Sequence, residues 1–378
     1  MPEWIVQYEN HEWDYVYGRF DPINPVVTFK HGYEPSTFTC EIALSDPKLT
    51  RELIGPKRND VRVYRDNNPI WDGELREVNL EFERDTLLCE HSDFMQYLDD
   101  RIFPFHYPWE FGDWPKGVPD PENPNRNYNW QNKDLFVIAR DIVEAMVADD
   151  PNVPPFEVGG SATGTLTTYL IHAGDQTTIL EHLRTLGDRE DGFDLRVNRT
   201  GDHIEIVLLH PRADDEEIVY TITKDIGQIT QFNWTNKGPD GTWTMGLGAG
   251  YPAKSLAAEY QHFDSIVQFR RRDNIVDFGR TRNLTHLQKL TAAENHRALF
   301  PQKELELSIL VNVAHLPNFW ALSLNRPQSL LGRRIWVGPI KFYDYWTVDA
   351  AFKILDMTIE PDEDGNEFCT FGLEMIDG

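Results

Sequence analysis

The stretch Val61-Arg-Val-Tyr-Arg-Asp-Asn-Asn-Pro-Ile-Trp-Asp-Gly-Glu-Leu75 indicates the class of fold. Val61 and Val63 alternate with larger polar neighbours, and the cluster Asp66-Asn-Asn-Pro69 then carries residues typical of turns. The chain leaves this cluster directly into the segment that begins at Ile70. Because side chains alternate between the two faces of a strand, this period of two predicts two strands joined by a tight turn.

Similar segments lie on both sides of this stretch. Alternating patterns occupy Phe38–Ala43 and Thr86–Glu90 in the first hundred residues. Repeated short strands with close turns predict an antiparallel barrel or sandwich. Near the other end, segments 352–359 and 368–375 flank Asp362-Glu-Asp-Gly-Asn366, a strong hairpin signal. The chain therefore begins and ends in similar strand-and-turn patterns, which favours two β-barrels that bracket mixed inserts.

The middle of the chain has helical spacing. Asn132 or Asp134 is placed to cap a first helix, and Thr178-x-x-Glu181 resembles a capping box at the start of a second. Apolar residues recur every three or four positions after these caps, which predicts amphipathic helices. The predicted helices cover residues 135–147, about 175–186 and 284–299.

The composition narrows the classes of function. The 378 residues include 36 Lys+Arg and 62 Asp+Glu, for a net charge of −26. So acidic a chain does not attract polyanions over its whole surface, which argues against a dedicated nucleic-acid- or anionic-membrane-binding protein. Apolar runs fall short of the roughly 18 residues that a membrane span needs, so we expect no membrane insertion. With three cysteines and no secretion signal, we expect folding in a reducing cytoplasm.

Residues 103–133 combine six prolines with eight large aromatic side chains. Proline interrupts regular structure, but disordered linkers are usually poor in aromatic residues. We therefore expect a long ordered loop that packs either on its own chain or on a neighbouring subunit. Trp109, Phe111 and Trp114 are the candidate residues of a subunit interface.

Motifs typical of cofactor and metal sites miss their spacing requirements. In Gly246-Leu-Gly-Ala-Gly250 the third glycine comes one residue too early for a dinucleotide-binding fingerprint, so a strand that ends in a turn is the preferred interpretation. Glu360-Pro-Asp-Glu-Asp-Gly-Asn366 resembles the front of a calcium-binding loop, but Phe371 stands where that loop needs a bidentate Glu. A solvated hairpin tip is the preferred interpretation there. No cofactor and no metal are predicted.

Catalytic motifs are equally incomplete. Cys89 and His91 lie two apart on a predicted strand, so a thiol–imidazole pair is conceivable, but a chance neighbour pair is preferred. Acidic residues are too numerous for the two carboxylates of a glycosidase to be selected. Arg270-Arg271-Arg272 is interpreted as a charge-compensating surface or subunit contact rather than a nucleic-acid site. The chain is therefore predicted not to be an enzyme, with no catalytic residues.

Several segments form a recognisable series along the chain: Phe38-Thr-Cys-Glu-Ile42, Val61-Arg-Val-Tyr64, Ile70-Trp-Asp-Gly-Glu-Leu75, Thr86-Leu-Leu-Cys-Glu90 and Leu98-Asp-Asp-Arg-Ile102. This series resembles the N-terminal domain of the tail hub proteins of long-tailed bacteriophages, those of actinobacterial phages most. These proteins are also called tail-associated, baseplate hub or minor tail proteins. Ile179-Leu-Glu-His-Leu183 with Gly192-Phe-Asp194 is similar to the middle α/β domain of that family. Leu331-Gly-Arg-Arg-Ile-Trp-Val337 with Phe352-Lys-Ile-Leu355 is similar to its C-terminal barrel.

The resemblance implies a structural role in a virion. Two tail-tube-like β-barrels per chain are expected to assemble as a homotrimer, so that six barrels continue the tail tube. The implied hub joins the distal tail protein ring to the tail tip, closes the tube until infection, and then lets genomic DNA pass without specific binding. Further implied partners are the tape measure protein and the receptor-binding or tip proteins. The implied location is the virion tail tip, after assembly in the host cytoplasm.

The predicted fold class is therefore α+β, mainly β, with two tail-tube-like antiparallel β-barrels bracketing mixed α/β insert domains. The five predicted segments are an N-terminal barrel, the aromatic loop, an α/β insert domain, a second mixed domain and a C-terminal barrel, over residues 1–102, 103–133, 134–211, 212–315 and 316–378. Strands near 212–237 are candidates to complete the first barrel. One alternative function is a carbohydrate- or receptor-binding tail protein that uses Trp109 and Trp114 as stacking platforms. A glycoside or cell-wall hydrolase is a more remote alternative.

Overall fold

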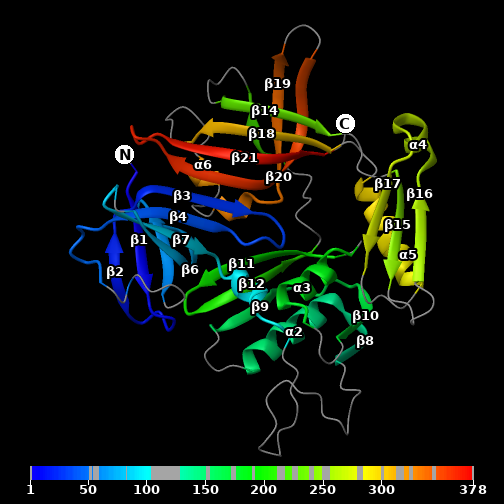
Figure 1. Ribbon diagram of the computed structural model, residues 1–378, viewed down its shortest axis with the longest axis horizontal. Helices are drawn as coiled ribbons and strands as arrows, with labels where there is room; N and C mark the ends of the chain where they lie inside the picture. Colours follow the sequence, from blue (N-terminus) through cyan, green and yellow to red (C-terminus); the bar gives the residue numbers. More distant parts are fainter. Residues whose placement is uncertain are drawn as a thin grey trace, which may run out of the picture. The chain divides into compact units, whose positions relative to one another are not determined.

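The computed structural model describes residues 2–376 except 51–52, 54–58, 82, 104–127, 150–153, 172–175, 190–191, 211–217, 224–228, 238–241, 249–255, 279–283, 299–301, 312–318, 323–326 and 343–345. Strands predominate, as predicted, and most of the helix lies in the middle of the chain (Figure 1). The chain divides into two compact units. Unit 1 comprises Met1–Thr230 and Ser308–Phe371, and unit 2 comprises Gln231–Leu307 and Gly372–Gly378.

The N-terminal strands of unit 1 follow the predicted alternation. They pair antiparallel in the order β3-β4-β7-β6-β5-β1-β2. β5 and β6 form the predicted hairpin, and Asp66 and Asn67 in its turn have φ angles of 49° and 63°. Aspartate and asparagine tolerate this left-handed conformation better than most residues, which explains the turn cluster. The elements are β1 (Trp4–Glu9), β2 (Val16–Phe20), β3 (Ile23–Lys30), β4 (Thr37–Ala43), β5 (Asp60–Arg65), β6 (Asn68–Glu81), β7 (Thr86–Ser92) and the short α1 (Met95–Asp99).

The C-terminal strands belong to the same 13-stranded sheet. β20 pairs antiparallel with β3, where Ile359 lies opposite Val27, so both ends of the chain contribute to one sheet. β20 and β21 flank the acidic segment at Asp362, as the hairpin signal predicts. The strands are β13 (Ile218–Ile222), β14 (Ile229–Lys237), β18 (Gln302–Leu310), β19 (Arg334–Phe342), β20 (Trp346–Pro361) and β21 (Glu367–Met375). Unit 1 also contains α6 (Phe319–Leu322) and the 3-10 helix η2 (Pro327–Leu330).

The first described strand within 212–237, the range expected to complete the N-terminal barrel, is β13. β13 pairs in parallel with β19 of the C-terminal region. The pairing sets Tyr220 opposite Ile335 and Ile222 opposite Val337, and all four side chains are buried. Burial of this apolar row against β19 explains the choice of partner. Among the described strands no pairing closes a ring, so the two closed barrels remain an expectation.

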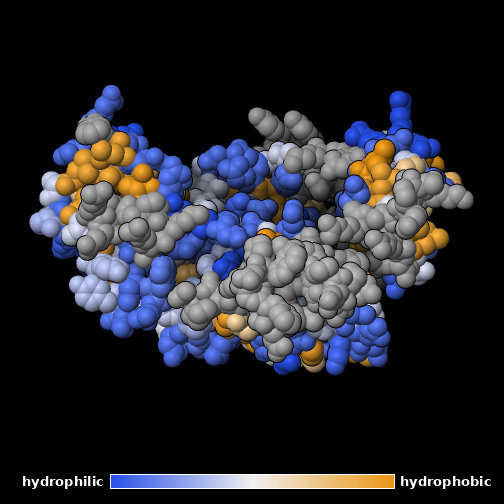
Figure 2. All heavy atoms as spheres, turned by 60° about the horizontal axis from the view of Figure 1, so that its bottom comes forward, coloured by the Kyte–Doolittle hydropathy of each residue, from blue (hydrophilic) through white to orange (hydrophobic). Residues whose placement is uncertain are grey.

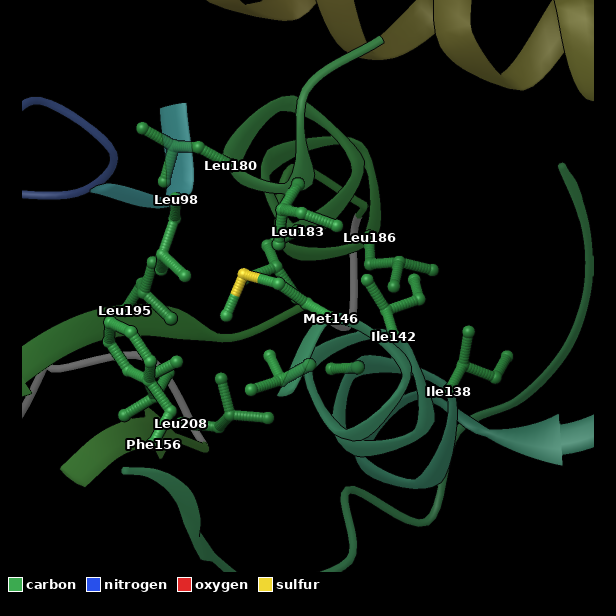
Figure 3. Close-up of a cluster of buried hydrophobic side chains, with 14 of the residues drawn as sticks. Leu98, Ile138, Ile142, Met146, Phe156, Leu180, Leu183, Leu186, Leu195 and Leu208 are labelled. Atoms are coloured by element: carbon green, nitrogen blue, oxygen red, sulfur yellow. The ribbon is translucent and has the colours of Figure 1, made fainter. Parts of the chain in front are cut away.

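An α/β insert follows α1 in unit 1. Its sheet has the order β11-β12-β9, and a separate pair joins β8 to β10. The apolar faces of the helices and of the three-stranded sheet meet in one core, which also contains Leu98 of α1 (Figure 3). The elements are β8 (Tyr128–Asp134), α2 (Leu135–Asp149), β9 (Phe156–Gly160), β10 (Leu166–Ile171), α3 (Ile179–Gly187), β11 (Asp194–Thr200) and β12 (His203–Leu209).

Both insert helices begin at predicted caps. The Asp134 carboxylate accepts a hydrogen bond from the backbone N–H of Phe136 at 2.8 Å. The Thr178 hydroxyl accepts one from the backbone N–H of Glu181 at 3.2 Å, as in a capping box. These bonds satisfy donors that the first turn of a helix leaves unpaired, which confirms two of the three predicted helices. β8 lies partly inside the segment 103–133 that was expected to be loop.

The described residues of unit 2 include a three-stranded sheet of order β16-β15-β17 and the helices α4 and α5. The third predicted helix is α5, which packs on β15 and β16. In this contact the side-chain amide of Asn295 donates to the Thr244 hydroxyl at 3.0 Å. A Cβ atom on Gly246 would collide with Thr291 of α5, so glycine permits the close approach of helix and sheet. The elements are β15 (Trp243–Gly248), β16 (Leu256–Gln261), α4 (Phe263–Phe269), β17 (Asp273–Asp277) and α5 (Leu284–Ala298).

Candidate functional site

The predicted subunit-interface residues Trp109, Phe111 and Trp114 lie outside the described residues. The described ends of the same aromatic segment are in the insert core. The ring centroids of Phe103 and Tyr128 lie 4.7 Å apart, and the indole N–H of Trp130 donates to the Asp141 carboxylate at 2.9 Å. Packing on its own chain is thus observed for these end residues, while the interface role of the central tryptophans stays a prediction.

A buried carboxylate, Glu367, links the N-terminal and C-terminal strands of unit 1. It lies at the start of β21 and has no exposed surface. The Arg65 guanidinium on β5 binds both carboxylate oxygens, with Nε–Oε1 and Nη2–Oε2 distances of 2.6 and 2.5 Å. The indole N–H groups of Trp4 and Trp320 donate to the same carboxylate at 3.1 and 3.2 Å. Each oxygen therefore accepts from two kinds of donor, which offsets the cost of burying the charge.

We call these four residues the Glu367 cluster. Arg65 also lies 4.2 Å from the ring centroid of Trp320, a cation–π distance. The cluster joins β1, β5, α6 and β21, so its chemistry is that of a structural link between distant segments.

A second buried cluster connects the N-terminal strands to the insert. Arg199, at the end of β11, has a side chain only 4% exposed, and its Nη1 lies 2.6 Å from Glu9 Oε2. Its guanidinium stacks 4.0 Å from the ring centroid of Trp13. Asp72 on β6 lies 3.9 Å from Arg199 Nη1 and 2.5 Å from Arg62 Nε. We call these five residues the Arg199 cluster.

The carboxylate of Asp72 shows how costly this burial is. Desolvation raises its pKa above the ordinary value, although the neighbouring Arg62 guanidinium acts in the opposite direction. Around Trp13, the indole N–H donates to Asp60 Oδ2 at 2.5 Å, and His11 Nδ1 lies 2.9 Å from Asp60 Oδ1. The Asp60 carboxylate raises the pKa of His11. The turn between β1 and β2 is thereby held against β5.

Part of the Arg199 cluster lines a pocket of about 180 Å³. The pocket lies between the N-terminal strands, the β11–β12 turn and η2. Four buried polar atoms on its lining residues make no hydrogen bond to the described part of the chain: Arg199 Nε and Nη1, Trp71 Nε1 and Gln328 Oε1. Each arginine at this pocket is paired with a carboxylate, Arg62 with Asp72 and Arg199 with Glu9.

Asp93 also lines this pocket. Its carboxylate accepts hydrogen bonds from the backbone N–H groups of Ser36 and Met95 at 2.9 and 3.1 Å. Desolvation of this half-buried carboxyl nevertheless raises its pKa to about 7. The neighbouring Ser36 hydroxyl accepts from the backbone N–H of Lys30 at 3.3 Å, and Asp93 bonds backbone groups on both sides, so we interpret Asp93 as a structural link between the turn before β4 and the start of α1.

The Cys89–His91 pair lacks the geometry of a nucleophile and its base. His91 Nε2 lies 3.0 Å from the Tyr8 hydroxyl oxygen, and Nδ1 lies 2.8 Å from the Phe38 carbonyl oxygen. Burial lowers the pKa of His91 to about 4 and raises that of Cys89 to about 11. A thiol with a raised pKa is unreactive near neutral pH, and the imidazole is occupied elsewhere, which supports a structural interpretation.

The acidic segment at 360–366 is a hairpin turn, as preferred from the sequence. The Asn366 side-chain amide donates to Asp362 Oδ2 at 2.9 Å, and the backbone N–H groups of Asp364 and Asn366 donate to Oδ1 at 2.9 and 2.8 Å. These bonds, the side-chain one most, lower the pKa of Asp362. Within the described ranges, no group of three or more His, Cys, Asp or Glu residues is arranged to hold a metal ion. None of the helices in that part of the chain is long and apolar enough to cross a bilayer.

The two buried clusters were missed by sequence reasoning, although one signal existed. Glu367 is in phase with Cys369, Phe371 and Leu373, which form the buried face of β21. A charged residue on the apolar face of a strand requires a buried partner. Arg199 carries no comparable local signal, because Glu9 is far away in the sequence.

No protein-family model and no curated protein matches this sequence. Solved structures do match. The 43 kDa tail protein of prophage MuSo2 from Shewanella oneidensis has 13% identity and a TM-score of 0.60, over 99% of this chain and 98% of that one. A tail protein from Neisseria meningitidis has 13% identity and a TM-score of 0.59, over 98% and 96%.

A third match is the prophage tail protein gp18 of Listeria monocytogenes, with 9% identity and a TM-score of 0.52, over 98% of this chain and 94% of that one. At these identities the likeness is one of fold, and it extends from end to end of the chains compared. The chain has the fold of phage tail proteins.

Proposed function

We propose that the chain is a structural protein of a phage tail, and that it serves as the hub of the tail tip or baseplate. The observation that carries this proposal is the end-to-end match of its fold to phage tail proteins, over 99% and 98% of the two chains in the first case. A match over the whole chain supports a shared architectural role more strongly than a match over a single domain would. The resemblance to actinobacterial-phage hub proteins in the sequence supports the finer assignment.

In this proposal the chain forms a homotrimer whose strands at both ends build tube-like barrels. The supporting observation is that both ends of the chain are β-structure and lie in one sheet. Exposed strand edges are a liability, and a closed ring of subunits covers them. Six barrels in three chains would continue a tail tube and close it until infection.

The charge of the chain suits a DNA conduit. The net charge of −26 repels phosphates, so DNA passing through makes few attractive contacts with the wall. We propose that genomic DNA passes without specific binding. The proposed neighbours are the distal tail protein ring, the tape measure protein and the receptor-binding or tip proteins, in a virion assembled in the host cytoplasm.

We also propose that the protein is catalytically inert. Three titratable groups with shifted pKa values, Asp93, His91 and Cys89, are held in structural hydrogen bonds or kept neutral by desolvation. None of these three combines an activated nucleophile with an accessible base. Turnover of cell-wall polysaccharide by the purified chain, abolished by a single carboxylate substitution, would contradict this part of the proposal.

Electron microscopy of the purified full chain tests the hub directly. We expect particles with threefold symmetry and a central opening, because three chains with two barrels each make a closed ring. A chain that stays monomeric at all concentrations examined, or one that forms particles without a central opening, would contradict the hub. A glycan array on the same material would reveal the carbohydrate-binding alternative.

A further inference from the structure

The two units differ sharply in charge. Unit 2 contains ten Lys+Arg and ten Asp+Glu residues, so the other 26 basic and 52 acidic residues belong to unit 1. The whole net charge of −26 is therefore carried by unit 1, and unit 2 is neutral overall. This division makes the two units electrostatically unlike surfaces.

Unit 2 also exposes apolar side chains on α4 and β17. Phe263 and Val267 of α4 are 70% and 85% exposed, and as an i, i+4 pair they lie on one side of the helix. Ile275 of β17 is 64% exposed. Ile275 pairs with Met245 of β15. The neighbouring residue Gly246 lies on the face of the sheet that packs on α5, and side chains alternate along a strand, so Met245 and Ile275 lie on the opposite face. Figure 2 shows hydrophobic side chains that reach the surface in clusters among hydrophilic ones.

Three arginines follow α4 directly, at Arg270, Arg271 and Arg272, and all three are exposed. Their backbone is fixed in place. The Thr242 hydroxyl donates to the Arg270 carbonyl oxygen at 2.9 Å and accepts from the Arg272 N–H at 2.8 Å. Arg271 lies 4.5 Å from the Trp243 ring centroid and bonds Asp273 at 2.6 Å. The arginines are thus presented on a rigid support beside the apolar pair.

We propose that Phe263, Val267 and Arg270–Arg272, here called the α4 surface, dock on the acidic surface of unit 1 in a second copy of this chain. Exposed apolar side chains beside a basic cluster fit a partner that is acidic and has apolar contacts to offer. Unit 1, with its net charge of −26, is such a partner. In an assembly of identical chains, unit 1 of a neighbouring copy is available to the α4 surface. This inference rests on the proposed self-assembly and names a surface that serves it.

DNA is a poorer fit to the same surface. A nucleic acid would meet the arginines but would leave Phe263 and Val267 without apolar contact. The neutral charge of unit 2 also gives little long-range attraction for a polyanion. DNA retention by the full chain that is lost on arginine substitution would overturn the proposal.

Two sets of variants test the α4 surface in the full chain. Phe263→Ser with Val267→Ser removes the apolar pair, and Arg270→Glu with Arg272→Glu reverses two charges. Arg271 is left intact because it packs on Trp243. Matched controls come from unit 1: Leu166→Ser, at an apolar side chain 58% exposed, and Arg184→Glu, at an arginine 56% exposed. Arg270→Lys with Arg272→Lys keeps the charges and serves as the conservative variant.

Sedimentation velocity over a concentration series, at low and high salt, is the readout. We expect the dissociation constant for self-association to rise about tenfold or more in each test pair, and by less than about twofold in the controls. The double lysine variant should associate within about threefold of wild type, because it retains the charges. Charge reversal should also flatten the salt dependence of association, because the charge complementarity is lost.

Three outcomes would overturn the proposal: a wild-type chain that does not self-associate, test pairs that assemble as wild type, or controls that fail equally. A loss of fold in the serine pair, seen by circular dichroism, leaves the arginine pair as the deciding variant. Carbodiimide cross-linking of the double lysine variant, in a mixture of ¹⁴N and ¹⁵N chains, separates contacts between copies from contacts within one. If threefold rings form although the test pairs have no effect, the hub stands and the α4 surface falls.

Discussion

The Glu367 cluster and the Arg199 cluster use the same kinds of side chain but differ in how completely these are satisfied. The Glu367 carboxylate accepts from Arg65, Trp4 and Trp320, and it has no exposed surface. The Arg199 guanidinium has one close carboxylate, and its Nε makes no hydrogen bond to the described residues. Both clusters remove charges from water, but only in the Glu367 cluster does the central charged group have a full set of hydrogen-bond partners.

This difference indicates which of the two clusters is the more rigid. A fully bonded buried carboxylate specifies one geometry, because any shift loses several bonds together. A cluster with unsatisfied atoms beside a pocket tolerates rearrangement at lower cost. The junction of the N-terminal and C-terminal strands should therefore be firmer than the junction of those strands with the insert.

The largest effect should come from Glu367→Ala. It leaves the buried Arg65 charge and two indole N–H groups without their acceptor, and we expect unfolding to become easier by about 3–5 kcal/mol. Urea denaturation of the full chain measures this. Glu34→Ala, at an exposed carboxylate paired with Lys30, is the control and should cost less than about 0.5 kcal/mol. A loss below about 1 kcal/mol for Glu367→Ala would remove the distinction between the clusters.

Arg199→Met should have the second-largest effect. It removes the ion pair with Glu9 and the stack on Trp13. Glu9 still accepts from the Gln7 side-chain amide and Asp72 keeps Arg62, so we expect a loss of roughly 2 kcal/mol. Arg184→Met on exposed α3 is the matched control, with little change in stability expected. If Arg199→Met lowered the free energy of unfolding as much as Glu367→Ala, the two clusters would contribute equally to stability.

The pH dependence of stability should reveal Asp93. Its folded-state pKa of about 7 exceeds the ordinary value of 3.8, so the folded chain binds more protons between these values. Its contribution to stability is therefore present at low pH and is lost as the pH rises from about 4 to about 7. Relative to wild type, Asp93→Asn should gain stability over this interval, by up to about 4 kcal/mol.

Thermal melts of wild type and Asp93→Asn across pH 4–8 provide the measurement. His91, whose pKa is lowered to about 4, acts in the opposite sense between pH 4 and 6.5, but it is common to both proteins. The difference between the two curves therefore isolates Asp93. Parallel curves would mean that Asp93 does not titrate near neutrality.

The smallest effect should come from Asp362→Ala at the hairpin turn. Asp362 accepts backbone hydrogen bonds from Asp364 and Asn366, but it lies in water and holds no buried partner. We expect a drop in melting temperature smaller than that of any buried-cluster variant. This variant calibrates what an exposed carboxylate contributes, and a larger drop than for Arg199→Met would reverse the ranking.

Local elements were predictable because their causes are local. The alternation around Val61 and Ile70 predicted the β5–β6 hairpin, and the Thr178 capping box predicted α3. The interface role of Trp109 and its neighbours stays a prediction. Completion of the first barrel by strands near 212–237 likewise stays a prediction; the observed pairing of β13 with β19 joins segments that are far apart in the sequence.

The sequence by itself determined the mainly β character, the helices with their caps, the terminal hairpin and the absence of complete catalytic motifs. These follow from side-chain periodicity and from hydrogen bonds between residues a few positions apart. Only the tertiary structure decided that β20 pairs with β3, that Arg65 binds Glu367 across 302 positions, and that Arg199 binds Glu9. The physical reason is that such contacts depend on which distant apolar faces pack together, and no short window of sequence contains both partners.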